Sequence, residues 1–214
     1  MNRIKKNSTI NTAQCRRCGL CCQKNSPSLH LADLNEIQAG NIPKDHLITY
    51  RKGEWVNDNV AGQLIQLKQD MIKPIENNIN GFCIFYIPNN QSCRIYDSRF
   101  LECKLQDCYN PDALKKVYSR DRLTRRDIFS LTSAAYEFIE YHESKCPLDE
   151  LENLSPSSNH QLSEQQKSYF REIIRFEYHF RYTLHERTGL NTKEMNFLLG
   201  RPLETILKQM SITF

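Results

Sequence analysis

The stretch Cys15-Arg-Arg-Cys18-Gly-Leu-Cys21-Cys22 packs four cysteines into eight residues. Two thiolates separated by two residues can point at one metal ion, because the backbone between them curls into a tight knuckle. Gly19, which follows Cys18, can adopt the left-handed conformation that such a knuckle often needs. This C-x2-C-x2-C-C pattern therefore predicts a metal site in the first part of the chain.

Cys15, Cys18 and Cys21 also match the first three steps of the bacterial iron–sulfur pattern C-x2-C-x2-C-x3-C-P. The fourth step differs, because Cys22 follows Cys21 directly and Gln23 stands where proline would. Neighbouring side chains of an extended segment point to opposite sides. We therefore expect Cys22 to bind a second ion or to lie beside the site, and not to share one compact centre with Cys21.

The alternative interpretation is that the cysteines form disulfides or pack as small buried hydrophobic residues. Nine cysteines among 214 residues fall below the roughly 8 to 10 % that marks a disulfide scaffold, and the odd count leaves one unpaired. Early charge without an apolar stretch behind it argues against a signal peptide, so we expect a cytoplasmic protein with reduced thiols. Thiolates suit zinc, copper(I) and iron–sulfur clusters, which favours a metal.

The later cysteines also cluster. They stand at Cys83, Cys93, Cys103 and Cys108, with Cys146 alone further along. Residues 81–96 have the pattern of a hairpin, in which an apolar strand, a turn at residues 89–91 and a second short strand follow one another. We expect Cys83 and Cys93 to face each other across this hairpin.

A short helix is predicted directly after the hairpin, capped by residues 97–98 and carrying Arg99 and Cys103. Tyr96 and Arg99 stand between predicted ligands. A guanidinium can neutralise a thiolate-rich centre, and a phenol can donate a hydrogen bond to sulfur. An ordinary salt bridge from Arg99 to Asp97 or Glu102 explains the arginine equally well.

Taken in order, the two cysteine blocks resemble the bacterial zinc- or iron-chelating cysteine-cluster domain, the CxxCxxCC or YkgJ-like family. The second block reads Cys93-x-Ile95-Tyr96-x-x-Arg99-x-x-x-Cys103-Lys104. The resemblance covers residues 15–108, about half of the chain. Phe100 and Lys104 stand where the family usually has proline and arginine, which affects local geometry and leaves the cysteine set intact.

Spacing and resemblance together predict a set of metal ligands. They are Cys15, Cys18, Cys21, Cys22, Cys83, Cys93, Cys103 and Cys108. The implied cofactor is an iron–sulfur cluster or a zinc or iron ion. A related cysteine pattern occurs in the longer flagellin lysine methylases, so the resemblance by itself assigns no enzymatic activity. No nucleophile, substrate pocket or glycine-rich phosphate loop is recognisable, and catalytic residues stay unassigned.

Composition excludes several classes of protein. With 29 basic and 25 acidic residues, the net charge of +4 is too mild to favour a nucleic-acid partner. No stretch approaches the roughly 18 apolar residues of a membrane span. An unidentified protein partner is left open by these observations.

The pattern along the chain predicts an α+β protein. Residues 1–14 form a polar, flexible arm, residues 15–108 a small, irregular, cysteine-rich metal-binding region, and residues 109–214 a mainly helical region packed on it. Within the cysteine-rich region we expect a helix over residues 31–37 that ends before Gly40, and strands at 47–50 and 63–67 that belong to one irregular sheet. We expect this region to need its metal for folding.

Caps and apolar periodicity place the later helices. Thr124 precedes a helix with one apolar face, which includes Leu131 and continues to Pro147. After a linker at residues 155–159, a capping box at residues 163–166 opens a long helix toward Gly189. Two short helices follow, one from residues 191–192 and one from Pro202.

Two functional hypotheses from different classes follow. The first is a metal-binding protein that uses an iron–sulfur cluster, zinc or iron in redox chemistry, in metal handling or as the core of a protein-modifying enzyme. The second is a zinc-stabilised interaction module without catalysis, in which the helical half binds a partner.

Overall fold

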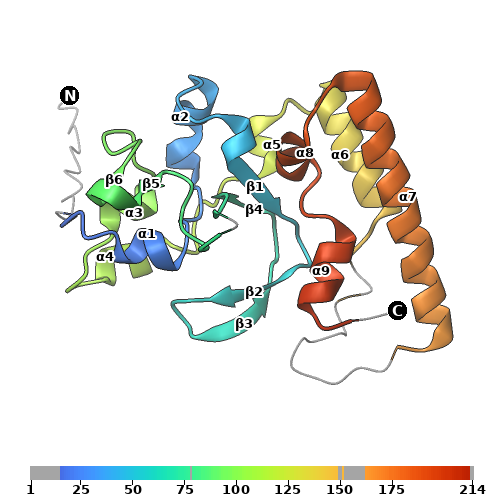
Figure 1. Ribbon diagram of the computed structural model, residues 1–214, viewed down its shortest axis with the longest axis horizontal. Coiled ribbons are helices and arrows are strands. Elements are labelled where there is room, and N and C mark those ends of the chain that lie inside the picture. The colour runs from blue at the N-terminus through green and yellow to red at the C-terminus, as the bar shows by residue number, and fades with distance from the viewer. Residues whose placement is uncertain (1–14, 78, 149–150, 152–161, 213–214) are drawn as a thin grey trace, which may run out of the picture.

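The computed structural model describes residues 15–77, 79–148, 151 and 162–212. Figure 1 shows the segments that carry the first eight cysteines at one end of the molecule and the long helix α7 (Glu164–Thr188) at the other, with the strands of residues 47–74 between them. The predicted flexible arm and the predicted linker at residues 155–159 lie outside the described residues. Short strands followed by a mainly helical half confirm the α+β class.

Short helices open the described chain. They are α1 (Leu20–Lys24), a 3-10 helix (Leu31–Asp33) and α2 (Leu34–Gln38), with a further 3-10 turn at Lys44–His46. The helix predicted over residues 31–37 is thus confirmed. It ends where predicted, because Gly40 has a φ of 77° and turns the chain out of the helix.

The strands form three separate antiparallel pairs, where the sequence predicted one sheet. The pairs are β1 (Leu47–Tyr50) with β4 (Met71–Pro74), β2 (Trp55–Asp58) with β3 (Gln63–Gln66), and β5 (Tyr86–Ile87) with β6 (Ser92–Cys93). The β1–β4 pair is largely buried, whereas the β2–β3 hairpin projects from the body in Figure 1. The three pairs share no strand, so each forms its own two-stranded sheet.

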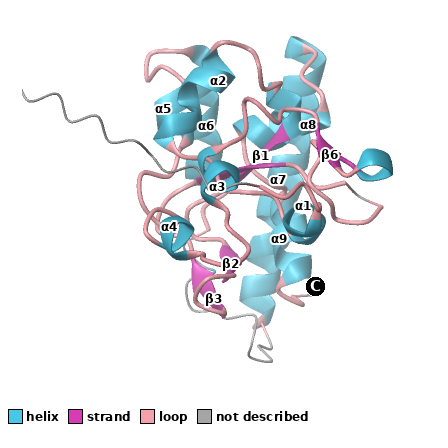
Figure 2. Cartoon of the chain, turned by 90° about the vertical axis from the view of Figure 1, so that its left-hand side faces the viewer, coloured by secondary structure: helices cyan, strands magenta, loops and turns pink. Residues whose placement is uncertain are grey.

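The remaining helices include three, α5 (Arg125–Ile128), α7 and α8 (Thr192–Leu198), that begin at the caps predicted from the sequence. The others are α3 (Leu101–Leu105), α4 (Asp112–Lys115), α6 (Ala134–Lys145) and α9 (Leu203–Gln209). Capping boxes begin α5 at Thr124, α7 at Ser163 and α8 at Asn191. Figure 2 shows α1, α3 and α4 on the side that carries the cysteines, joined mostly by loops.

The single helix predicted from Thr124 to Pro147 is wrong. The chain leaves α5 after Ile128, and α6 starts only after Ser133, whose hydroxyl oxygen accepts a hydrogen bond from the Tyr136 N–H. Leu131 lies in this break and is 63 % exposed, so it does not belong to an apolar helix face. Local capping by serine therefore overrides the apolar periodicity here.

One hydrophobic core joins the cysteine region to the helical half. Phe197 of α8 packs with Leu47, Ile72 and Phe100. The Thr49 hydroxyl donates a 2.6 Å hydrogen bond to the Phe197 carbonyl, which fixes α8 against β1. The hydrophobic core beside the cysteine region therefore includes a residue of α8, a helix far along the chain.

Buried ion pairs connect the same two parts. Arg51 and Arg125, which are almost fully buried, both bind the Glu143 carboxylate on α6, and Arg125 also binds Asp70 at 2.7 Å. A fully buried carboxylate, Glu54, pairs with Arg201 just before α9. Removing one partner from such a pair leaves a buried charge and typically costs about 3–5 kcal/mol. These contacts fix the strand region relative to α6 and α9.

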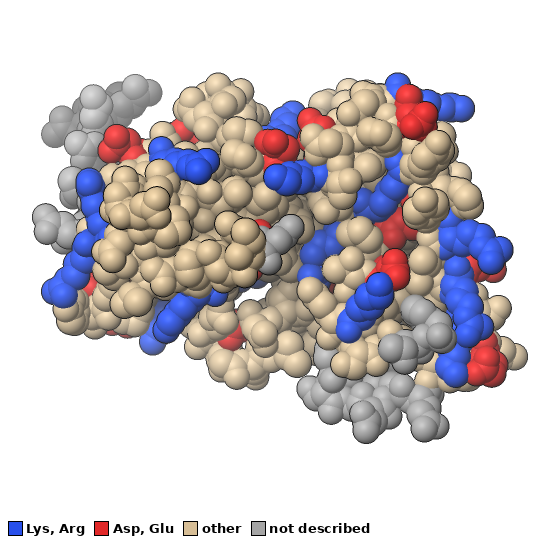
Figure 3. All heavy atoms as spheres, in the orientation of Figure 1, with Lys and Arg blue, Asp and Glu red and all other residues tan. Residues whose placement is uncertain are grey.

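Two surface properties bear on function. Along the part of the chain that the structure describes, no helix has the length and apolar character needed to cross a membrane. On the face shown in Figure 3, basic side chains are interspersed with acidic ones.

Candidate metal centre

The predicted knuckle forms at Gly19, whose φ of 75° and ψ of −6° are left-handed, as its position in the sequence predicts. The Arg17 N–H points back at the Cys15 sulfur at 3.4 Å, and Arg17 also has a positive φ of 58°. A Cβ atom at position 19 would lie 2.2 Å from the Tyr86 hydroxyl oxygen. Only glycine therefore lets the first cysteine block approach the β5–β6 hairpin this closely.

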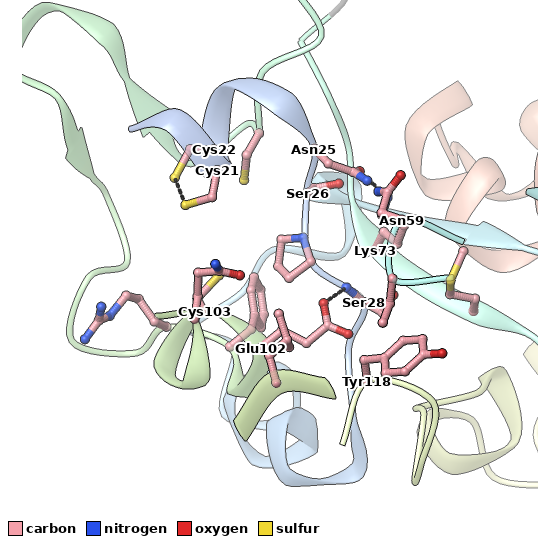
Figure 4. A pocket seen from close by; sticks show the side chains of 18 of the residues that line it. Cys21, Cys22, Asn25, Ser26, Ser28, Asn59, Lys73, Glu102, Cys103 and Tyr118 are labelled. Carbon is pink, nitrogen blue, oxygen red and sulfur yellow. Dashed lines mark hydrogen bonds between the residues drawn. The ribbon is translucent and has the colours of Figure 1, made fainter. Parts of the chain in front are cut away.

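Cys21 and Cys22 do not point to opposite sides, and the expectation that they would is wrong. Both lie in α1, where neighbouring side chains are about 100° apart and can serve the same face. Their sulfur atoms are 3.9 Å apart. Figure 4 shows both sulfurs facing Cys103 across one end of a cavity. A helix starting at Leu20 was not predicted, which explains the error.

The hairpin register also differs from the prediction. Cys93 pairs with Tyr86 across β5–β6, and Cys83 instead bridges to Glu76. The Cys83 N–H donates a 2.8 Å hydrogen bond to the Cys22 carbonyl, which joins the two cysteine blocks through the backbone.

Cys103 lies on α3, which starts at Leu101 after an N-cap at Phe100, so Arg99 precedes the helix and residues 97–98 do not cap it. The Asp33 carboxylate instead accepts the Leu101 N–H at 2.8 Å.

The eight predicted ligands surround two adjoining cavities. The larger one measures about 250 Å³ and the smaller one about 60 Å³. Cys21, Cys22, Cys93 and Cys103 line both; Cys83 lines only the larger, and Cys15, Cys18 and Cys108 only the smaller. Cys146 lies elsewhere, fully buried in the core between α7 and α9. The structure brings these eight thiols together, and their role as ligands stays a prediction.

The sulfurs are near one another but not in coordination geometry. Among the described residues, no group of three His, Cys, Asp or Glu side chains is placed to hold one ion. Zinc–sulfur bonds of about 2.3 Å would require the cysteines to rotate inward, chiefly about χ1. The donor chemistry nevertheless fits a thiophilic centre, because all nine cysteines are free and eight of them face the two cavities.

Three arginines near the thiols stack on tyrosine rings. The guanidinium carbons of Arg17 and Arg99 each lie 3.8 Å from the centroid of the Tyr96 ring, and that of Arg16 lies 4.2 Å from the Tyr109 ring. These cation–π contacts hold the first cysteine block against the segments that carry Cys93 and Cys108. The positive charges lie where a thiolate-rich centre would carry negative charge.

Arg99 carries an unpartnered buried donor at this place. Its Nε donates to the Tyr96 carbonyl at 2.8 Å, but its buried Nη1 has no hydrogen-bond partner among the described residues. Within the described part of the chain, Arg99 forms no ion pair with Asp97 or Glu102, and the Glu102 carboxylate instead binds His30 at 3.1 Å and the Ser28 N–H at 2.9 Å. A buried N–H without an acceptor is costly, and sulfur ligands or sulfide of a metal centre would satisfy it. The residues present therefore fit the implied group.

Burial favours the protonated form of several of these thiols, because it raises their pKa. It raises the pKa of Cys83 to about 11 and that of Cys103 well above its usual value. Cys21 differs, because the hydrogen bond from Cys22 lowers its pKa to about 6 and raises that of Cys22. Metal coordination would have to displace these protons, so binding at this site would release protons.

Sequence reasoning missed the other residues of the larger cavity. Its walls include Lys73 of β4, Tyr118 and Arg122. Lys73 is far in the sequence from Tyr118 and Arg122, and none of the three belongs to a recognisable motif. Among the additional cavity residues, Glu102 could have been predicted from the sequence, because it stands next to Cys103.

These features define a cysteine-cluster domain with a candidate thiolate metal centre. The chain belongs to the CxxCxxCC family, described as "Putative zinc- or iron-chelating domain", whose family model matches residues 14–147. Membership in this family supports metal binding. The match extends past Cys108 and so includes α4, α5 and α6. No curated protein and no solved structure matches the chain.

Proposed function

We propose that this protein holds an iron–sulfur cluster, or more than one zinc or iron ion, through Cys15, Cys18, Cys21, Cys22, Cys83, Cys93, Cys103 and Cys108. The observation that carries the proposal is the convergence of eight thiols on two cavities that share four of them. A structural zinc ion uses four ligands. Eight thiols therefore favour a polynuclear centre or two neighbouring ions over a single zinc.

The arginines supply the charge balance that such a centre requires. A metal with four thiolates carries net negative charge in either the zinc or the iron–sulfur form. Arg99 offers its unpartnered Nη1, while Arg16 and Arg17 bring positive charge on the first cysteine block itself. When bound, an iron–sulfur cluster would supply electron transfer. An iron or zinc ion would instead supply Lewis-acid chemistry. The protein then acts in redox chemistry, metal handling or modification of another protein.

A zinc-stabilised interaction module is the second candidate. It is supported by exposed tyrosines on the helical half, at Tyr141 of α6 and at Tyr178 and Tyr182 of α7. Tyrosine is enriched in protein–protein interfaces. In this case the metal only stabilises the fold, and α6 and α7 bind an unidentified protein partner.

We also place the protein in the cytoplasm, where thiols stay reduced. All nine cysteines are free, which agrees with a reducing compartment. We expect neither a membrane nor a nucleic acid as partner, because the net charge of +4 is mild.

Anaerobic purification distinguishes the two candidates. The first predicts a coloured protein with broad visible absorption and stoichiometric iron and sulfide, or, for zinc, more than one ion per chain. The second predicts a colourless protein with one tightly held zinc ion. A protein that contains no stoichiometric metal under these conditions would contradict both.

A further inference from the structure

The larger cavity extends beyond the cysteines into a chamber that the metal proposal does not use. Its side walls are apolar and include Val56, Ile65, Met71 and Leu114. In Figure 4, Lys73 and Tyr118 lie at the opposite end from Cys21 and Cys22, with Glu102 along one wall. Figure 3 shows the surface hollowed beside the β2–β3 hairpin, which contributes to this chamber. A volume of about 250 Å³ approaches that of small-molecule sites.

The acidic side chains of the chamber are already satisfied. Asp58 accepts hydrogen bonds from the Val60 and Ala61 N–H groups, each at 2.9 Å, and its other oxygen faces the Tyr118 hydroxyl at 3.4 Å. Both oxygens of Glu102 are bound, one by His30 and one by the Ser28 N–H. Both carboxylates are therefore already engaged by donors of the protein.

One basic side chain of the chamber, Arg122, in contrast retains free donors. Arg122 uses its Nε to bind the Tyr118 carbonyl at 2.9 Å, and its two terminal nitrogens have no partner among the described residues. Its side chain is half-buried, so these donors are partly withdrawn from water.

Lys73, which is only 8 % exposed, binds Asn25 Oδ1 and lies 3.8 Å from Glu76. Its Nζ also lies 5.8 Å from the centroid of the Tyr50 ring, so its donors are engaged within the protein. Near the cysteines, the unpartnered Nη1 of Arg99 is the donor that the proposed metal centre would use.

We propose that this chamber binds a small organic carboxylate, with its anionic group held by Arg122 and its apolar part against Met71, Leu114 and the neighbouring side chains. A free guanidinium fork matches the two oxygens of a carboxylate. Arg122 lines the chamber with terminal donors that no described side chain uses, so a monoanionic carboxylate complements it. The mostly apolar walls suit an organic acid better than inorganic phosphate.

The ligand's far end would lie toward Cys21, Cys22, Cys83 and Cys103, so the chamber opens onto the candidate metal centre. This inference goes beyond the proposed function and does not require a particular metal. Carboxylate recognition depends on Arg122, whereas metal retention depends on the cysteines. Carboxylate binding can therefore be absent while metal binding is present, and the reverse.

Calorimetric titration of the full-length protein tests the inference. The probes are hexanoate and benzoate, their neutral amides hexanamide and benzamide, and inorganic phosphate. We expect the carboxylates to bind and the amides to bind at least about tenfold more weakly, because a charge-assisted hydrogen bond is lost. Equal binding of the amides, tighter binding of phosphate, or no binding of either carboxylate would overturn the inference.

Arg122→Gln should weaken carboxylate binding by about tenfold to a hundredfold. Arg122→Lys, which keeps the charge but loses the fork, should fall between Arg122→Gln and the unmodified protein. The matched control is Arg126→Gln, because that side chain is 72 % exposed and does not line the cavity. Metal content measured in every sample separates this result from the metal proposal. Unchanged affinity in folded Arg122→Gln protein with normal metal content would overturn the inference.

Discussion

Gly19 shows at the scale of one residue how the sequence shapes the candidate centre. Its left-handed backbone lets the chain turn from the first cysteine pair into α1, and its missing side chain makes room for the Tyr86 ring. The conformational requirement could be predicted from the C-x2-C pattern. The steric one could not, because Tyr86 belongs to a hairpin more than sixty residues along the chain.

Gly19→Ala separates these two requirements when it is compared with Gly40→Ala. Both glycines have a φ near 75°, so alanine should cost about 1–2 kcal/mol at either position. Only position 19 meets another side chain, whereas a Cβ at position 40 has nothing within 4 Å. We expect Gly19→Ala to lower both the free energy of unfolding and the metal content, and Gly40→Ala to lower only the former. Equal metal content in the two variants would show that the Gly19–Tyr86 approach does not shape the site.

Arg99 provides a second prediction at this scale. Its unpartnered Nη1 should gain an acceptor when sulfur ligands are deprotonated and bound to metal. We expect Arg99→Gln to weaken metal retention against a competing chelator by about tenfold to a hundredfold. The control is Arg94→Gln, because Arg94 is close to Arg99 in the sequence and is exposed. Identical metal release from both variants would mean that Arg99 only stacks on Tyr96.

The α6–α7 pair shows how two elements depend on one buried charge cluster. His142 of α6 and Glu177 of α7 form a 3.0 Å contact, and Arg181 binds the same carboxylate oxygen at 2.9 Å. The other oxygen accepts the Leu203 N–H at 2.7 Å, which attaches α9. One carboxylate therefore holds three helices together.

This cluster predicts that acid destabilises the helical half. Burial alone would raise the pKa of Glu177, but the His142 hydrogen bond and the Arg181 charge lower it to about 2. Burial lowers the pKa of His142. The unfolded chain therefore takes up protons below pH 6.5 at the histidine and below about 4.5 at the glutamate, while the native state does not. The free energy of unfolding is therefore highest above these pH values and falls as the pH decreases. Glu177 contributes roughly 3 kcal/mol to this decrease.

Urea unfolding between pH 7 and pH 3 measures this effect. We expect Glu177→Gln to be less stable at pH 7 and to lose less stability on acidification than the unmodified protein. Glu186→Gln on an exposed position of α7 is the control and should follow the unmodified protein. The same pH dependence in Glu177→Gln and Glu186→Gln would contradict the assignment.

Elements with strong local signals were predictable, and those set by distant contacts were not. The capping residues Ser163 and Asn191 fixed the starts of α7 and α8 because they bond within their own first turn. The register of β5–β6 was wrong, since Cys83 is drawn away by its bridge to Glu76. The position of α3 was wrong because its N-terminus is capped by Asp33, from another segment.

In the whole molecule, the strand region bridges the cysteine cluster and the helices. Leu29 donates its N–H to the Ile72 carbonyl and accepts the Leu123 N–H, so the segment after α1 lies between β4 and the approach to α5. The α+β class follows from local periodicity and was predictable. The cavity was not, because residues from several distant segments line it and none carries a recognisable motif.

Metal removal should therefore loosen the protein unevenly. Residues 15–28 and 81–108 carry the candidate ligands and have little regular structure, so we expect chelation to expose protease sites there. The β1–β4 pair should stay protected, because it packs against Phe197 of α8. Limited proteolysis with mass spectrometry, before and after chelation under reducing conditions, locates the cuts. Unchanged protease resistance of the metal-free protein would show that coordination does not organise the cysteine region.

The metal content of cysteine variants tests the central claim most directly. Iron, zinc and sulfide per chain would be measured in anaerobically purified Cys21→Ala, Cys93→Ala and Cys103→Ala, with Cys146→Ala as the control, because Cys146 lies apart from the two cavities. The account predicts that each of the three cluster variants loses most of its metal and that Cys146→Ala keeps the content of the unmodified protein. Full metal content in the three cluster variants, or equal loss in Cys146→Ala, would contradict it.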